Sequence, residues 1–261
     1  MAIIKNKFLV GILGNLIFKV VNGKQVVTTR KPKGTTKQSA KTIRSSKTYG
    51  LASQFGSEIM ESYHNNLNKM QDGTMFRRLT PLLFNELNNG WNAEKEAFEF
   101  DNLDFKSLAG FEYNIKSRLT ASTHIRTIVT FANGKLDVTV KKMSFMGAIK
   151  FPKVATSCEL TVSVVLFRLQ DGLKIRSAIS QSQMIHQQLN VLEKENFTFA
   201  VPGLCLCLVS TFLHFYWYSH KHSFCINTSK FNPAAITAAV FIPESVTPLS
   251  DFSWVEMLKL D

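Results

Sequence analysis

The segment covering residues 16–33, LIFKVVNGKQVVTTRKPK, decides the architecture of the N-terminal part of the chain. Two stretches rich in β-branched residues flank the dipeptide Asn22-Gly23. Both central residues of a two-residue hairpin turn need a positive φ angle, which Asn tolerates and Gly adopts without steric cost. Pro32 has no N–H group to donate to a sheet, so it ends the second strand. The sequence therefore predicts a β-hairpin that runs directly into a basic stretch.

The positive charge of the chain is concentrated at this end. The 261 residues carry a net charge of +12. Residues 1–57 contain eleven Lys and Arg residues and no acid before Glu58, whereas the remaining 204 residues hold 20 basic and 19 acidic residues. This asymmetry favours a polyanionic partner, such as nucleic acid, an anionic membrane surface or an acidic protein. The alternative is a solvated tail that contributes only to solubility.

Eight cations of this basic segment are the candidate binding residues. They lie on the predicted hairpin, in the basic stretch after it, and on one face of the helix expected next. We expect them to contact phosphate groups without reading base sequence, since phosphate contacts position a protein but carry no base information. The candidate polyanion-binding residues are Lys24, Arg30, Lys31, Lys33, Lys37, Lys41, Arg44 and Lys47.

Two helices are predicted after the hairpin. In residues 35–71, apolar residues recur mostly at intervals of four, which indicates one stripe along a long helix. We expect Thr35 or Thr36 to cap this helix and Asp72-Gly73 to end it. We expect the second helix to begin with Thr80 as its N-cap and Pro81 in its first turn, and to stop at Asn89-Gly90. Residues 91–121 are expected to form an irregular loop.

From about His124 onward the chain is predicted to be all-β. Asn133-Gly134 and Asp171-Gly172 each separate two strand-like stretches, as in two-residue hairpins. From Leu160 to Phe167, apolar residues recur at every second position, which is typical of a half-buried strand. Seven or eight strands at this spacing predict an antiparallel β-sandwich.

The uncharged run of residues 204–218 has two interpretations. A membrane-spanning helix needs about 20 apolar residues, whereas this run follows Pro202-Gly203 and stops at residue 219. Its β-branched and aromatic residues, within a β-rich region, favour a long central strand. We expect no membrane association.

No motif of a known catalytic or cofactor site is present. His220 and His222 could share one face of a strand and bind a metal, but the sequence indicates no third ligand nearby and the local pattern is that of a turn. Cys205 and Cys207 lie in an apolar run, where free Cys packs as a small hydrophobic residue. We therefore expect no metal and no cofactor. Four cysteines in 261 residues and the lack of a signal-peptide pattern indicate a reducing, cytoplasmic location.

The N-terminal segment resembles the opening of small basic Bacteroidetes proteins of unknown function. The resemblance rests on the Gly11-x-x-Gly14-Asn15-Leu16-Ile17-Phe18 pattern, on Asn22-Gly23-Lys24-Gln25-Val26-Val27, on the basic linker, and on Tyr49-Gly50-Leu51-Ala52-Ser53 in the helix. The resemblance covers about 55 residues and rests only on the pattern of residue types. It implies a β-rich domain after a basic arm, and it implies no catalytic residues.

These observations predict an α+β protein with three parts: a basic hairpin arm (1–34), a helical segment (35–92) and a β-sandwich (93–261). We expect a non-enzymatic binding or structural protein whose arm contacts a polyanion, such as nucleic acid. The alternative is an assembly protein that self-associates. In this case the arm docks on a neighbouring subunit by strand addition. An isolated hairpin is marginally stable, so the arm needs a surface to pack on in either case.

Overall fold

Strands outweigh helices in the structure of this chain, which is a computed structural model. The structure describes residues 2–32, 38–100, 103–144, 148–188, 191–219, 222–244 and 247–258. The chain contains 44% strand and 23% helix, which confirms the predicted mixed α+β class. It divides into two compact units, Met1–Ser45 and Ser46–Asp261. The three-part division at residues 34 and 92 stays a prediction.

The N-terminal unit contains a four-stranded antiparallel sheet. Its strands follow one another in the order of the chain. They are β1 (Ile3–Lys5), β2 (Phe8–Leu13), β3 (Leu16–Val21) and β4 (Lys24–Thr29). The predicted hairpin is confirmed, with φ angles of 49° at Asn22 and 74° at Gly23. Strands β1 and β2 occupy most of residues 1–15, and Gly14 (φ 56°) makes the turn into β3.

Helix α1 (Ala40–Ser62) begins after Ser39, whose hydroxyl accepts the backbone N–H of Thr42 at 3.2 Å. A side-chain oxygen in this position satisfies one of the backbone donors that the first turn of a helix leaves unpaired. The predicted caps Thr35 and Thr36 lie outside the described residues. The apolar stripe is confirmed, since Leu51, Phe55, Ile59, Tyr63 and Leu67 are all buried.

The predicted boundary between the two helices is wrong. Helix α1 stops at Ser62 and is followed by the short α2 (His64–Leu67), which ends where Asn68 adopts a φ of 48°. Helix α3 (Met75–Asn89) begins five residues before Thr80 and contains Pro81 in its interior. The hydroxyl of Thr80 donates to the carbonyl of Phe76 within this helix. The predicted stop at Asn89-Gly90 is confirmed.

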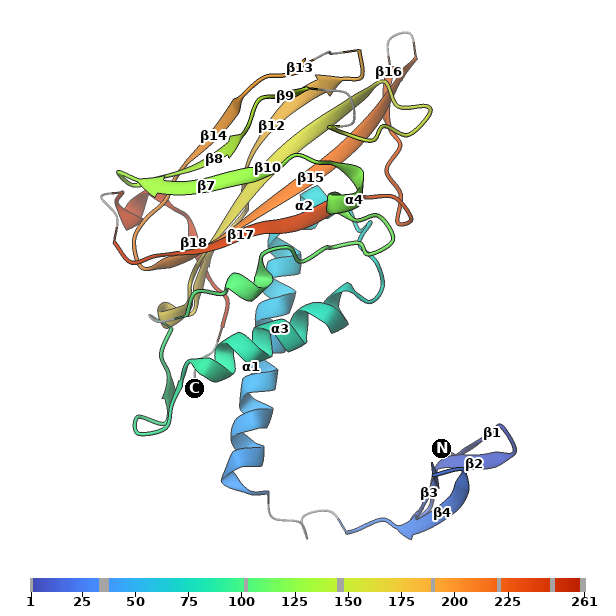
Figure 1. Ribbon diagram of the computed structural model, residues 1–261. Coiled ribbons are helices and arrows are strands. Elements are labelled where there is room, and N and C mark those ends of the chain that lie inside the picture. The colour runs from blue at the N-terminus through green and yellow to red at the C-terminus, as the bar shows by residue number, and fades with distance from the viewer. Residues whose placement is uncertain are drawn as a thin grey trace. The chain divides into compact units, whose positions relative to one another are not determined.

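Helices α1 and α3 cross one another (Figure 1), and Gly56 lies at the crossing. A Cβ atom at Gly56 would lie 3.3 Å from Phe76 and 3.5 Å from Leu83. The absence of a side chain therefore lets the two helices approach closely.

The largest element is a curled, seven-stranded antiparallel sheet in the second unit (Figure 1). Its strands are β10 (Ser157–Arg168), β11 (Leu173–Ile175), β12 (Ile179–His186), β15 (Cys205–Ser219), β16 (His222–Cys225), β17 (Ala234–Ile242) and β18 (Trp254–Glu256). The run at residues 204–218 is thus confirmed as a long strand. The prediction that residues 160–167 are half-buried is wrong, because residues on both faces of β10 are buried.

A separate three-stranded antiparallel sheet contributes to the same hydrophobic core. It consists of β7 (Thr127–Ala132), β8 (Lys135–Val140) and β14 (Glu195–Ala200). The predicted Asn133-Gly134 hairpin joins β7 and β8. The remaining short elements are β5 (Trp91–Asn92), β6 (Ala97–Phe98), η1 (Lys106–Leu108), α4 (Leu119–Ser122), β9 (Met143–Ser144), η2 (Leu169–Asp171), β13 (Val191–Leu192) and η3 (Leu249–Asp251).

The turn predicted at Asp171-Gly172 is present but longer than two residues. The 3-10 turn η2 precedes Gly172, which has a φ of 65°. The backbone carbonyl of Gly172 accepts the N–H groups of Met257 at 2.8 Å and Leu258 at 3.2 Å. The turn therefore anchors the C-terminal strand region to the main sheet.

We expect Gly172→Ala to destabilise the protein more than Gly110→Ala. Both glycines have a positive φ, which costs a residue with a Cβ about 1–2 kcal/mol. Only at Gly172 would the added Cβ also overlap a backbone atom, the carbonyl oxygen of Leu258. Overpacking of this kind costs about 1–3 kcal/mol more. Urea denaturation of both variants measures the difference, and equal midpoints would contradict the turn geometry.

Candidate functional site

The first candidate site is the basic face of the β3–β4 hairpin. The register pairs Lys19 with Val26 and Val21 with Lys24. Side chains alternate between the two faces of a strand, so Lys19 and Lys24 project from the same face. The sequence prediction included Lys24 and missed Lys19. The sequence does contain a signal for Lys19. The two-residue turn fixes the register, and the register decides which face each residue of the two strands occupies.

Arg30 continues the basic face beyond the end of β4, and Lys31 is the next residue along the chain. The backbone N–H of Arg30 donates to the carbonyl of Asn15 at 2.6 Å, which extends the pairing by one residue. Arg30 thereby takes the next position on the face of Lys24. Both side chains are exposed. The predicted binding residues Lys33 and Lys37 lie outside the described residues.

The remaining predicted cations lie on the first turns of helix α1. Lys41, Arg44 and Lys47 follow one another at intervals of three residues, so they cover one side of the helix. The first turn of α1 contains no acidic residue. Since the N-terminus of a helix has a partial positive charge, these cations strengthen a field that is already positive.

Carboxylates do not pair with five of the predicted cations within the described part of the chain. None of the ion pairs between described residues involves Lys24, Arg30, Lys31, Lys41 or Lys47. The structure thus agrees with the acid-free sequence of this segment in leaving these charges open to solvent.

The N-terminal sheet has no core of its own. Among described residues 2–32, none is buried. Apolar side chains are well exposed, including Ile4 (79%) and Leu13 (60%). On the hairpin face opposite Lys19 and Lys24, the register places Leu16, Phe18 and Val27 without any charged residue. This opposite face is called the uncharged face below.

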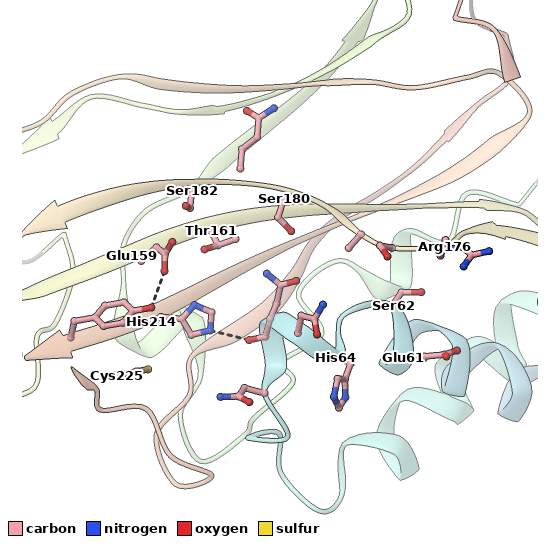
Figure 2. A pocket seen from close by; sticks show the side chains of 17 residues that line it. Glu61, Ser62, His64, Glu159, Thr161, Arg176, Ser180, Ser182, His214 and Cys225 are labelled. Carbon is pink, nitrogen blue, oxygen red and sulfur yellow. Dashed lines mark hydrogen bonds between the residues drawn. The ribbon is translucent and has the colours of Figure 1, made fainter. Parts of the chain in front are cut away.

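The second candidate site is a polar cavity of about 630 Å³ in the second unit (Figure 2). It lies on the face of the main sheet where helix α1 ends. The strands contribute Glu159 and Thr161 from β10, Ser180 and Ser182 from β12, and His214 and Tyr216 from β15. The helical segment contributes Glu61, Ser62, His64, Asn65, Asn66 and Asn68. The sequence analysis predicted none of these residues.

Strand register explains why these side chains meet. Glu159 pairs with His214 in β15, and Thr161 pairs with Ser182 in β12. Paired residues of neighbouring antiparallel strands project from the same face. Polar residues at every second position of three adjacent strands therefore form one continuous polar surface.

Hydrogen bonds fix the orientation of three of these side chains. The hydroxyl of Tyr216 donates to Oε2 of Glu159 at 3.0 Å. Nε2 of His214 lies 2.9 Å from the carbonyl oxygen of Asn66, as the dashed line in Figure 2 shows. Because a carbonyl oxygen only accepts, the His214 ring must carry a proton on Nε2.

A buried lysine ties the helix to the sheet beside the cavity. Nζ of Lys174, on β11, lies 2.7 Å from Glu58 and 2.9 Å from Glu61, both on α1. The side chain of Lys174 is only 5% exposed. Its hydrogen bond and charge lower the pKa of Glu61. A buried ammonium group needs such partners, because burial without them is costly.

The cysteines pack as the sequence predicted. Cys205 and Cys207 are buried, with their sulfurs 3.9 Å apart, and are not disulfide-bonded. Burial raises the pKa of Cys207 well above its usual value, so the inert thiol is favoured. His220, which the sequence places near His222, lies outside the described residues. Within the described ranges, no group of three or more His, Cys, Asp or Glu side chains is arranged to hold a metal ion.

No helix among the described residues is both long enough and apolar enough to cross a membrane. Searches of protein-family models and of curated proteins found no match to this chain. The resemblance to small basic Bacteroidetes proteins stays a prediction.

We expect Glu159→Gln to lower the pKa of Tyr216. Burial, and then the hydrogen bond and charge of Glu159, raise this pKa above 10.0. A phenol with a raised pKa in the folded state stabilises the fold below pH 10, and this stabilisation is lost as the pH rises through the folded pKa. Absorbance titration of the protein, of Glu159→Gln and of Tyr216→Phe identifies the transition. An unchanged titration in Glu159→Gln would show that the pair does not form.

Proposed function

We propose that this chain is a non-enzymatic binding protein whose N-terminal segment contacts a polyanion, such as nucleic acid, without reading its sequence. The observation that carries this proposal is the exposed basic face of the β3–β4 hairpin. Lys19 and Lys24 share that face, Arg30 continues it, and Lys31 is exposed next to Arg30 in the chain. Cations on one surface can contact neighbouring phosphates of a single strand or duplex.

The energetic basis is the release of counterions from the nucleic acid. Each phosphate neutralised by Lys or Arg frees condensed cations, so affinity falls steeply with salt concentration. Lys41, Arg44 and Lys47 on helix α1 supply a second basic surface next along the chain. Lys33 and Lys37 lie outside the described residues, and the proposal includes them on the basis of the sequence alone.

We expect affinity for a short DNA duplex to fall by roughly two to four decades between about 50 and 200 mM salt, as for five to seven phosphate contacts. The triple variant Lys19→Ser, Lys24→Ser and Arg30→Ser should reduce the salt slope by about three. Fluorescence anisotropy with a labelled duplex and a labelled single strand measures both. Duplexes of different base sequence should bind alike.

The matched control removes three exposed lysines from the second unit, Lys116, Lys135 and Lys153. Each triple variant changes the net charge equally. If the dependence of affinity on salt concentration becomes less steep only in the hairpin variant, this result supports contact through the basic face. Equal slopes in both variants would indicate a non-specific effect of net charge, and no binding at low salt would exclude the polyanion proposal.

Assembly is a second candidate function, favoured by the uncharged face. A sheet without a buried residue that exposes large apolar side chains is marginal on its own and marks an interaction surface. Strands β1 and β4 are the edges of this sheet, where an additional strand can pair. In this alternative, the N-terminal sheet docks on a neighbouring subunit by strand addition and apolar packing.

We expect self-association, if assembly is the function, to persist at high salt, because apolar contacts are not screened. Leu13→Ser with Val27→Ser should abolish it, since both residues project from the uncharged face. Val154→Ser with Leu249→Ser is the control pair, because these residues are exposed elsewhere. Light scattering coupled to gel filtration gives the mass of each variant. A monomer under all conditions would exclude assembly through copies of this chain.

Two predictions from the sequence, the β-sandwich arrangement and the reducing location, stay proposals. The sandwich arrangement is supported by Leu136, Val138 and Phe199, which are buried in the three-stranded sheet and belong to the core shared with the main sheet. A reducing location is supported by the four cysteines, none of which is disulfide-bonded.

A further inference from the structure

We propose that the polar cavity beside the end of helix α1 binds a neutral, hydroxyl-rich small molecule of the mono- or disaccharide class. This ligand site is independent of the N-terminal segment and of any polyanion bound there. The volume of about 630 Å³ falls within the range of about 300–1,000 Å³ typical of small-molecule sites.

The cavity exists because the helix is shorter than the sheet face it covers. Phe55 and Tyr63 pack against Phe167 and Phe212 on this face of the sheet. Helix α1 ends at Ser62, and the chain turns away at Asn68. Strands β10 and β15 continue past that point, and their side chains change there from aromatic to polar. Polar residues in an uncovered strand face keep the surface hydrated until a ligand replaces the water.

Several polar groups at the cavity have no partner within the described residues. Glu159 uses Oε2 for Tyr216 and leaves Oε1 open. The hydroxyls of Thr161 and Ser182 make no hydrogen bond to the described chain, although Thr161 is only 6% exposed. These groups face the cavity from β10 and β12 in Figure 2.

His214 adds a further open position. Its Nε2 donates to the carbonyl of Asn66, so Nδ1 is the ring nitrogen that remains for a ligand. Asn65 and Asn68 bring amide groups, which both donate and accept, from the opposite wall. The cavity therefore presents donors and acceptors on both sides, and a sugar hydroxyl, which also donates and accepts, matches this mixture.

The charges around the cavity favour a neutral ligand. Lys174 is shared by Glu58 and Glu61, so these three side chains keep one negative charge between them, and Glu159 and Arg176 add one charge of each sign. An anionic ligand would face the open oxygen of Glu159, and a cationic ligand would face Arg176. A carboxylate and a guanidinium can instead each bind hydroxyl groups of an uncharged ligand through charge-assisted hydrogen bonds. Ala178 and the Tyr216 ring supply apolar surface for the C–H groups of a sugar ring.

Isothermal titration calorimetry with maltose, lactose, cellobiose and chitobiose tests this proposal, with inorganic phosphate and spermidine as charged probes. We expect saturable binding of at least one disaccharide and none of either charged probe at the cavity. Thr161→Val, which keeps the shape and removes the hydroxyl, should weaken binding at least tenfold. Glu159→Gln should also weaken it, because the amide replaces an acceptor with a donor.

Thr130→Val is the matched control, since Thr130 is exposed on β7, a strand that contributes no residue to the cavity. Thermal denaturation confirms that each variant is folded. Deleting residues 2–32 should leave disaccharide binding unchanged, which separates this site from the N-terminal segment. The proposal is overturned if no disaccharide binds, if Thr161→Val binds as tightly as the unmodified protein, or if phosphate binding is lost in the cavity variants.

Discussion

The pairing of β10 with β15 is the constraint on which the second unit depends. Eleven consecutive residue pairs join the two strands, from Ser157↔Tyr216 to Phe167↔Leu206. Nearly all of β10 is buried on both faces. A strand that is buried on both faces needs cover on both sides of its sheet, which the strands of an isolated antiparallel sheet do not need. The rest of the unit supplies that cover.

Helix α1 provides the cover on one side, and it is fixed there by both apolar and polar contacts. Phe55 packs edge-on against Phe167, with ring centroids 5.0 Å apart. The buried hydroxyl of Tyr63 donates to the backbone carbonyl of Leu208. Lys174 clamps the same helix through Glu58 and Glu61. These directional bonds select one position of the helix along the sheet, whereas apolar packing alone tolerates several. The cavity follows from that position, because it begins where the cover ends.

Local patterns in the sequence predicted much of the fold. Asn-Gly dipeptides at residues 22 and 133 located two hairpins, since the required φ angles depend on those two residues alone. The helix boundaries were missed because they depend on tertiary contacts. Pro81 indicates a helix start by local rules, but it lies inside α3, where a helix–helix interface stabilises the surrounding turns. The half-buried prediction for β10 failed for the same reason, because alternation cannot show what covers the second face.

The cavity could be predicted only in part. Glu159, Thr161 and Ser163 occur at every second position of an otherwise apolar strand, so the sequence does place them on one face. Their meeting with His214 depends on the register between β10 and β15, which are distant in sequence and are not joined by a tight turn. The basic hairpin was accessible to prediction because all of its pairing is local. Lys19 was missed although the same local register places it beside Lys24.

The contact between Tyr63 and Leu208 spans 145 residues of sequence, which has a consequence for synthesis on the ribosome. Helix α1 emerges early, but the strand against which its apolar stripe packs is made much later. At about 5–20 residues per second, this interval lasts roughly 7–30 s. During that time the strand that packs against Phe55, Ile59 and Tyr63 has not been made. The nascent chain therefore exposes an apolar helix face that follows the basic N-terminal segment in the sequence. The order in which this fold is translated therefore leaves its first long helix without its partner strand until late in synthesis.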